Sequence, residues 1–180
     1  GIRGKGRGFS GGGVGEDGDG TGAGLTGTAG GGGGHAGVGM EGVEDCEGTE
    51  VALDNGGSLV DSSSTTDLFM GAGGGGGTTG SGGRGGGGVH VIADVLSLQG
   101  GISTKGGKPR DSIDIRDGGS GSGGTVYIEA QTITCGDAAL VDVRGGSGLR
   151  RTLIGGSIAI PDAFGGVGAG GRILIEAELG

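Results

Sequence analysis

The chain has 180 residues, of which 58 are glycine and two are proline, and its formal charge is −9. Collagen is excluded, because a glycine content near one third occurs here without a three-residue period or abundant proline. Long helices are excluded as well, because each glycine in a helix interior costs about 1 kcal/mol relative to alanine. The negative charge disfavours nucleic-acid binding, and no apolar run reaches the roughly 18–20 residues of a membrane span.

The composition also limits how the chain can be ordered. Apolar residues make up 31% of the sequence and aromatic residues 2%, so a deep core of large side chains cannot be built. Glycine loses more conformational freedom on folding than any other residue. We therefore expect an all-β protein that is ordered by backbone hydrogen bonds, close backbone packing and neighbouring copies of the chain.

Residues 1–34 alternate glycine with small or charged residues. This pattern predicts an extended, polyproline-II-like arm that runs along or into a neighbouring subunit, with a flexible linker as the alternative. Arg3, Lys5 and Arg7 alternate with Gly4 and Gly6, which places three cations on one strand face.

An acidic cluster follows within the same segment, at Glu16, Asp17 and Asp19. Carboxylates on tight turns can ligate calcium. The cluster lacks the spacing of a calcium-binding helix–loop–helix motif, so solvated turn carboxylates are the alternative to a calcium site.

Residues 35–88 form an acidic insert followed by a glycine run. Four glutamates recur every third residue, and an extended helix of three residues per turn would align them on one edge; they are Glu41, Glu44, Glu47 and Glu50. One interpretation is head-to-tail electrostatic matching between this acidic stripe and the basic tip of a neighbouring chain. The other is two separate solvated surfaces.

The two cysteines, Cys46 and Cys135, favour a disulfide if the chain is extracellular. The bridge would close a long loop. Two free buried thiols are the alternative.

Residues 89–180 contain a repeat in which a glycine pair precedes a short alternating strand. The copies begin at Gly87-Gly88, Gly123-Gly124 and Gly170-Gly171. Aligning the glycine pairs places Val126, Ile128, Ile173 and Ile175 inward, Tyr127 and Glu129 outward, and His90 and Asp94 inward. Strands centred near residues 91, 103, 114, 128, 142, 158 and 174 fit a β-solenoid or, alternatively, a β-sandwich.

The runs Gly30–Gly34 and Gly73–Gly77, with His35-Ala-Gly and the glycine-pair strand repeats, carry a resemblance over residues 30–180. This part of the chain resembles the glycine-rich β-repeat regions of large secreted and cell-surface proteins of bacteria and protists. The resemblance implies an extracellular, solenoidal structural region, and it transfers no catalytic residues.

These observations predict a non-enzymatic structural subunit of an extracellular filament, fibre or sheath that binds copies of itself. His35 and His90 do not belong to any recognisable catalytic arrangement of side chains. The first alternative is a monomeric surface-binding module, either an adhesin with surface glycans as partners or an ice-binding protein. The second is a carbohydrate-active β-helix protein.

Overall fold

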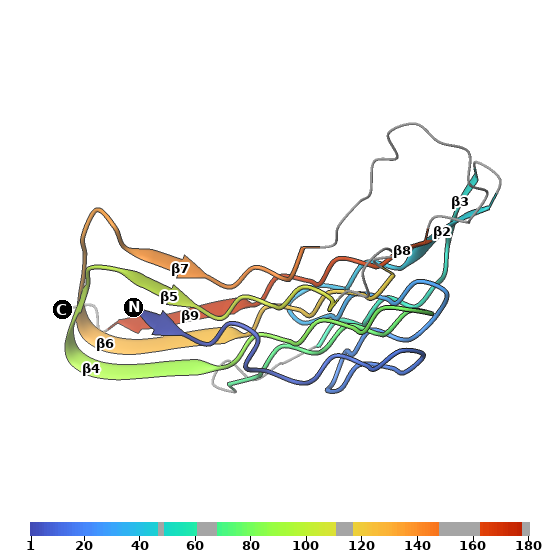
Figure 1. Ribbon diagram of the computed structural model, residues 1–180. Helices are drawn as coiled ribbons and strands as arrows, with labels where there is room; N and C mark the ends of the chain where they lie inside the picture. Colours follow the sequence, from blue (N-terminus) through green and yellow to red (C-terminus); the bar gives the residue numbers. More distant parts are fainter. Residues whose placement is uncertain (47–48, 61–67, 111–116, 148–162, 178–180) are drawn as a thin grey trace.

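The computed structural model describes residues 1–46, 49–60, 68–110, 117–147 and 163–177 (Figure 1). Within these residues the chain forms nine strands and no helix, and so no helix that could cross a membrane, which confirms the all-β class. The strands are β1 (Ile2–Arg3), β2 (Val43–Cys46), β3 (Thr49–Ala52), β4 (Val89–Leu98), β5 (Gly101–Ser103), β6 (Thr125–Cys135), β7 (Leu140–Asp142), β8 (Ala163–Phe164) and β9 (Arg172–Ala177).

Two of the three sheets are parallel and form the strand half of the molecule. Their orders are β4–β6–β9 and β1–β5–β7. Gln99 and Gly100 turn β4 back into β5, and residues 136–139 turn β6 back into β7, so the second sheet lies over the first (Figure 1). The predicted strands near residues 91, 103, 128, 142 and 174 are therefore confirmed, and those near 114 and 158 lie outside the described residues.

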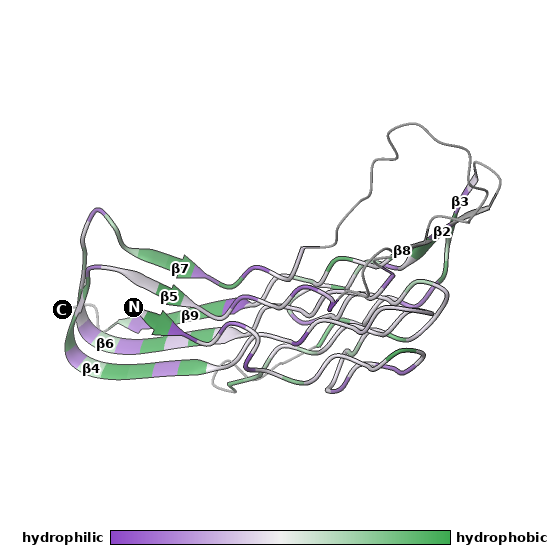
Figure 2. Cartoon of the chain, viewed as in Figure 1, coloured by the Kyte–Doolittle hydropathy of each residue, from purple (hydrophilic) through white to green (hydrophobic). Residues whose placement is uncertain are grey.

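The apolar core lies between these two sheets. Ile102 of β5 packs with Val126, Ile128 and Ala130 of β6, and valines, leucines and an isoleucine of β4, β6 and the β7 region surround them. Figure 2 shows the hydrophobic residues of the molecule concentrated along these strands. The period-two alternation of the repeats is what directs these side chains inward.

The alternation gave the correct register for β6 and β9, but not the burial of β9 and not the register of β4. Val126 and Ile128 are 0% and 2% exposed, as predicted, whereas Ile173 and Ile175 of β9 are 43% and 57% exposed. Ile173 and Ile175 share the inward face with Val126 and Ile128, but they are exposed because, in the described part of the chain, the β1–β5–β7 sheet ends at β7 and does not extend over β9.

The β4 register also differs from the prediction by one residue. Val89 pairs with Val126, and His90 pairs with Tyr127, so His90 lies on the outer face of the sheet. The aligned glycine pairs gave the wrong register for β4. In that alignment Val89 and Val91 would face outward, whereas the observed pairing keeps both valines on the inward face with Val126 and Ile128.

The third sheet is antiparallel and contains a hairpin. β2 pairs with β3 from Val43↔Ala52 to Cys46↔Thr49, and its other edge pairs with β8 through Val43↔Phe164. In Figure 1 this sheet lies at the opposite end of the molecule from the turns between β4 and β5.

Between these two ends lies the glycine lattice, which we define as residues 4–42, 53–60, 71–88, 104–110, 117–124, 143–146 and 165–171. Its segments are joined by backbone hydrogen bonds that advance three residues at a time in both partners. Phe9, Gly12 and Gly15 donate to the carbonyl oxygens of Gly71, Gly74 and Gly77 at 3.1, 3.0 and 3.0 Å. Consecutive residues also bond in different directions: Gly30 donates to Asp117, Gly31 to Leu25 and Gly32 to Met40.

Close approach between segments explains most of the glycines of this lattice, although an added Cβ at Gly6, Gly15 or Gly170 would meet nothing within 4 Å. A Cβ atom at Gly31 would lie within 3.0 Å of the Asn55 backbone, and one at Gly119 within 3.0 Å of the Gly31 carbonyl. Asn55 is the polar exception and is 4% exposed. Its Oδ1 accepts from Gly42 N at 2.8 Å and its Nδ2 donates to Ala29 O at 2.6 Å, so the amide joins two segments.

The lattice changes the predicted domain organisation. Residues 1–34 do not form a separate arm, because β1 pairs with β5 and Gly8 N donates to Gly85 O at 2.8 Å within the same chain. Gly75 N donates to Gly31 O and Gly33 N to Ser120 O, so residues 1–34, 35–88 and 89–180 contribute to one hydrogen-bonded body.

Candidate functional site

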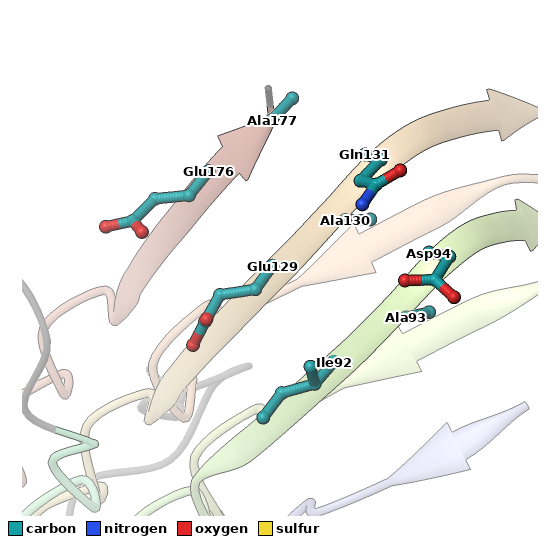
Figure 3. Close-up of a pocket in the computed structure, with 8 residues that line it drawn as sticks. All are labelled: Ile92, Ala93, Asp94, Glu129, Ala130, Gln131, Glu176 and Ala177. Atoms are coloured by element: carbon teal, nitrogen blue, oxygen red, sulfur yellow. The ribbon is translucent and has the colours of Figure 1, made fainter.

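The outer face of the β4–β6–β9 sheet carries a polar pocket of about 610 Å³. Asp94 of β4, Glu129 and Gln131 of β6, and Glu176 of β9 line it together with Ile92 and three alanines. Figure 3 shows the Glu129 and Glu176 side chains extending in the same direction from neighbouring strands. The parallel register produces this grouping, since it pairs Ile92 with Glu129 and Glu129 with Glu176.

A histidine–tyrosine stack lies next to the pocket. The rings of His90 and Tyr127 are parallel, with 4.5 Å between their centroids and 8° between their planes. His90 Nε2 lies 2.5 Å from Glu129 Oε1. Tyr127 is on the outer face, as predicted, but it is only 4% exposed and therefore is not a surface residue.

The environment of Tyr127 stabilises its neutral form. Burial, followed by hydrogen bonding to Glu176 and the negative charges of Glu129 and Glu176, raises the pKa of the Tyr127 hydroxyl to about 12. One face of its ring is covered by His90. The pocket can therefore accept hydrogen bonds from hydroxyl or ammonium groups through its carboxylates, and it offers less aromatic surface for stacking.

The predicted calcium ligands do not come together. Glu16, Asp17 and Asp19 are exposed; Glu16 Oε2 accepts from Gly13 N at 3.2 Å and Asp17 Oδ1 from Thr26 N at 2.7 Å. Nowhere in the described ranges do three His, Cys, Asp or Glu side chains form a group that could hold a metal ion. The two bonded carboxylates instead stabilise turns of the lattice.

The basic residues of the predicted assembly site do not lie on one strand face. Only Arg3 belongs to β1, and residues 4–7 form a turn in which Arg7 N donates to Gly4 O at 3.1 Å and Gly6 has a φ of 60°. Arg3, Lys5 and Arg7 are exposed, while Gly4 and Gly8 are buried.

The predicted acidic stripe is not formed either. Glu44 lies in β2 and Glu50 in β3, and the register Glu44↔Val51 directs the two glutamates to opposite faces of the hairpin. Glu41 precedes β2, and Glu47 lies outside the described residues. The prediction is wrong because this segment forms a hairpin with a side-chain period of two instead of an extended helix with a period of three.

The predicted disulfide is also absent. Cys135 is a free, exposed thiol at the end of β6. Cys46 lies in β2, at the opposite end of the molecule (Figure 1). Spacing in the sequence could not reveal this separation, because the return path through the lattice places β2 and the end of β6 far apart.

Two further polar sites were not identified from the sequence. His35 is 3% exposed, its Nε2 lies 3.2 Å from Thr125 Oγ1, and burial followed by the charge of Arg172 lowers its pKa. On β7, Asp142 accepts from Arg144 Nε and Nη2, both at 2.8 Å, which is the main reason that the pKa of Asp142 falls to about 2. The pairing of Asp142 with Arg144 could have been predicted from the Val-Asp-Val-Arg pattern, because residues two apart in an extended segment lie on the same face and these two carry opposite charges.

Comparison with known proteins identifies no relative. The chain matches no protein-family model, no curated protein and no solved structure.

Proposed function

We propose that this protein is a structural subunit of an extracellular filament, fibre or sheath, and that it acts by self-association. The observation that carries the proposal is the apolar inward face of β9, which no strand of the described residues covers. Ile173 and Ile175 are 43% and 57% exposed, although their register partners Val126 and Ile128 are almost completely buried. An apolar strand face with a free backbone edge is a site for the addition of further strands.

The construction of the molecule supports a mechanical role. The turns that join β4 to β5 and β6 to β7 repeat the same arrangement, which is the arrangement of a β-solenoid coil, and we assign the fold to that class. The step of three residues in the lattice is the period of a polyproline-II helix, so we assign its segments to that conformation. Both arrangements use backbone hydrogen bonds as their main source of order and can be extended by repetition.

The extracellular location rests on the resemblance to glycine-rich β-repeat regions of secreted and cell-surface proteins. Because Cys135 is a free thiol, the cysteines do not support it. Protease accessibility of the protein on intact cells tests the location directly.

Electron microscopy and light scattering of the full chain over a range of concentrations test self-association. We expect linear assemblies, and we expect Ile175→Lys to reduce their formation at least tenfold. Val14→Lys is the matched control, since Val14 is 53% exposed and the residues on either side of it bond to Gly74 and Gly77 and not to the β9 region. A wild-type chain that stays monomeric at every concentration would exclude the proposal.

A second candidate function is the binding of a hydroxyl-rich ligand such as a glycan in the outer pocket. The grouping of Asp94, Glu129, Gln131 and Glu176 favours it, because these side chains accept hydrogen bonds from hydroxyl groups. Calorimetric titration of wild type and Glu176→Gln with acidic and neutral oligosaccharides would detect such binding. Equal and negligible heats for both variants would exclude it.

A further inference from the structure

The chain contains a single asparagine, Asn55, and it is followed by Gly56 and Gly57. A backbone nitrogen reaches the preceding asparagine amide most easily when it belongs to glycine, which has no Cβ and turns freely. Gly56 N then attacks Asn55 Cγ, the Cγ–Nδ2 bond breaks, and the amide nitrogen takes the Gly56 proton and leaves as ammonia. Water opens the resulting succinimide to aspartate or isoaspartate, so the reaction needs no other reactant.

The folded chain holds the Asn55 side chain away from this reaction. The side chain is 4% exposed, its Oδ1 accepts from Gly42 N at 2.8 Å, and its Nδ2 donates to Ala29 O at 2.6 Å. Turning Cγ toward the following nitrogen requires rotation of the side chain, which breaks both hydrogen bonds. Burial also limits the access of the water that the second step consumes.

The backbone of the same dipeptide is held as well. The Asn55 carbonyl oxygen accepts from Leu25 N at 2.9 Å. A Cβ added at Gly31 would lie 2.9 Å from Gly56 N, so the Gly31 backbone packs against the attacking nitrogen. The amide and the nitrogen that would attack it are therefore both fixed by neighbouring segments.

The segment that carries Asn55, residues 53–60, lies at the periphery of the glycine lattice. Asp54, Ser58 and Leu59 are exposed. Asp54 has a φ of 51°, in the left-handed region that is unfavourable for a residue with a side chain, so release of the segment relieves this strain. Peripheral segments open locally without unfolding of the whole chain.

We propose that Asn55 is a deamidation site that the glycine lattice protects, and that its modification makes a local opening permanent. The amide reacts only while residues 53–60 are detached from the lattice. A carboxylate at position 55 has no donor for Ala29 O, and its charge would be buried beside that carbonyl oxygen. Isoaspartate also adds a methylene group to the backbone, which displaces the hydrogen bonds that follow. The proposal does not depend on self-association.

Mass spectrometry of the full chain measures the reaction. Replacement of the amide NH2 by OH raises the mass, and peptide mapping assigns the change to the single asparagine. Wild type is incubated at mildly alkaline pH in native buffer and in denaturing urea. We expect deamidation to be at least tenfold slower in native buffer, and its rate to rise with urea below the unfolding transition because urea favours the open segment.

Gly31→Ala and Gly37→Ala are a matched pair for the role of the lattice. A Cβ at position 31 meets the Asn55 backbone, whereas one at position 37 makes an ordinary contact with the Ala169 Cβ at 4.0 Å. In native buffer we expect Gly31→Ala to deamidate at least tenfold faster than Gly37→Ala, whether the substitution detaches this segment or unfolds the chain. Equal rates would overturn the protection by the lattice.

Two results with wild type would also overturn the proposal. One is a rate in native buffer that is within tenfold of the rate in urea, and the other is an unmodified Asn55 after incubation in urea. Permanence is tested by returning the chain deamidated in urea to native buffer. We expect its free energy of unfolding to be lower than that of unmodified chain treated in the same way, and equal values would show that the modified segment returns to the lattice.

Discussion

Replacing Gly31 by alanine tests whether close backbone packing stabilises the glycine lattice. An added Cβ would lie within 3.0 Å of the Asn55 backbone, which belongs to a neighbouring segment and cannot rotate away. Relieving the contact must move backbone that is hydrogen-bonded on both sides: Gly31 N donates to Leu25 O at 2.9 Å, and Gly75 N donates to Gly31 O at 2.8 Å.

The size of the effect follows from three contributions. Overpacking costs about 1–3 kcal/mol, and each weakened hydrogen bond costs about 0.5–1.5 kcal/mol. Alanine offsets about 0.4–1 kcal/mol by restricting the unfolded chain. We expect Gly31→Ala to lower the free energy of unfolding by about 2–4 kcal/mol, which in a chain of this length lowers the melting temperature by about 5–15 °C.

Gly37→Ala is the matched control. Gly37 lies six positions further along the same part of the chain, and the nearest atom to an added Cβ is the Ala169 Cβ at 4.0 Å, an ordinary van der Waals contact. Far-ultraviolet circular dichroism during urea denaturation measures both variants, since the chain has no tryptophan for fluorescence. If the two variants unfold within about 0.5 kcal/mol of each other, close packing does not limit this position.

Three further predictions concern buried polar groups. Asn55→Ala should lower the free energy of unfolding in urea by about 2–4 kcal/mol, because it leaves the buried Gly42 N–H and the buried Ala29 C=O without their partner. Asn55→Asp keeps the oxygen that accepts from Gly42 N and loses the donor to Ala29 O. In neutral solution it should cost less than Asn55→Ala only if the bond from Gly42 contributes more than the bond to Ala29. His35 has a lowered pKa in the folded chain, so the unfolded chain binds more protons and stability should fall as pH drops below about 6.5; an equal acid dependence in His35→Gln would contradict this. The pKa of Tyr127 is raised to about 12, so the folded chain binds more protons than the unfolded chain, and stability should be lost as pH rises from about 10 to about 12. Tyr127 is the single tyrosine of the sequence, so an ultraviolet titration reports on it alone, and in Glu176→Gln its pKa should shift toward the usual value.

The sequence was informative where side chains repeat with a fixed period. Val126, Ile128 and Ala130 alternate with polar or aromatic residues in a way that only a strand between two layers explains, and the structure buries all three. The positions of β4, β5, β7 and β9 followed from the same reasoning. Local alternation determines these strands, so long-range information is not needed to locate them.

Contacts between distant segments could not be derived in this way. Whether Ile173 is covered depends on a strand in the other sheet, and the pairing of β2 depends on a hairpin whose residues also fit an extended helix of period three. The separation of Cys46 from Cys135 depends on the whole path of the lattice. In each case the local pattern was compatible with two arrangements, and tertiary pairing selected between them.

The distribution of glycine nevertheless records the depth of each segment in the lattice. In the polyproline-II conformation proposed above, residues point in three directions, so a segment surrounded by other backbones has room only for glycine or a small side chain; Ala72 and Ser122 are examples of the latter and are 0% exposed. Residues 30–34 and 73–77 are uninterrupted glycine, and every one of these residues is buried. At the edge, one direction in three faces solvent: Ser81 and Arg84 are accessible while Gly82, Gly83 and Gly85 are buried. A run of glycine thus identifies a central segment. A larger residue after a glycine pair does not by itself identify a peripheral one, because Ser120 and Thr125 each follow such a pair and are 0% exposed.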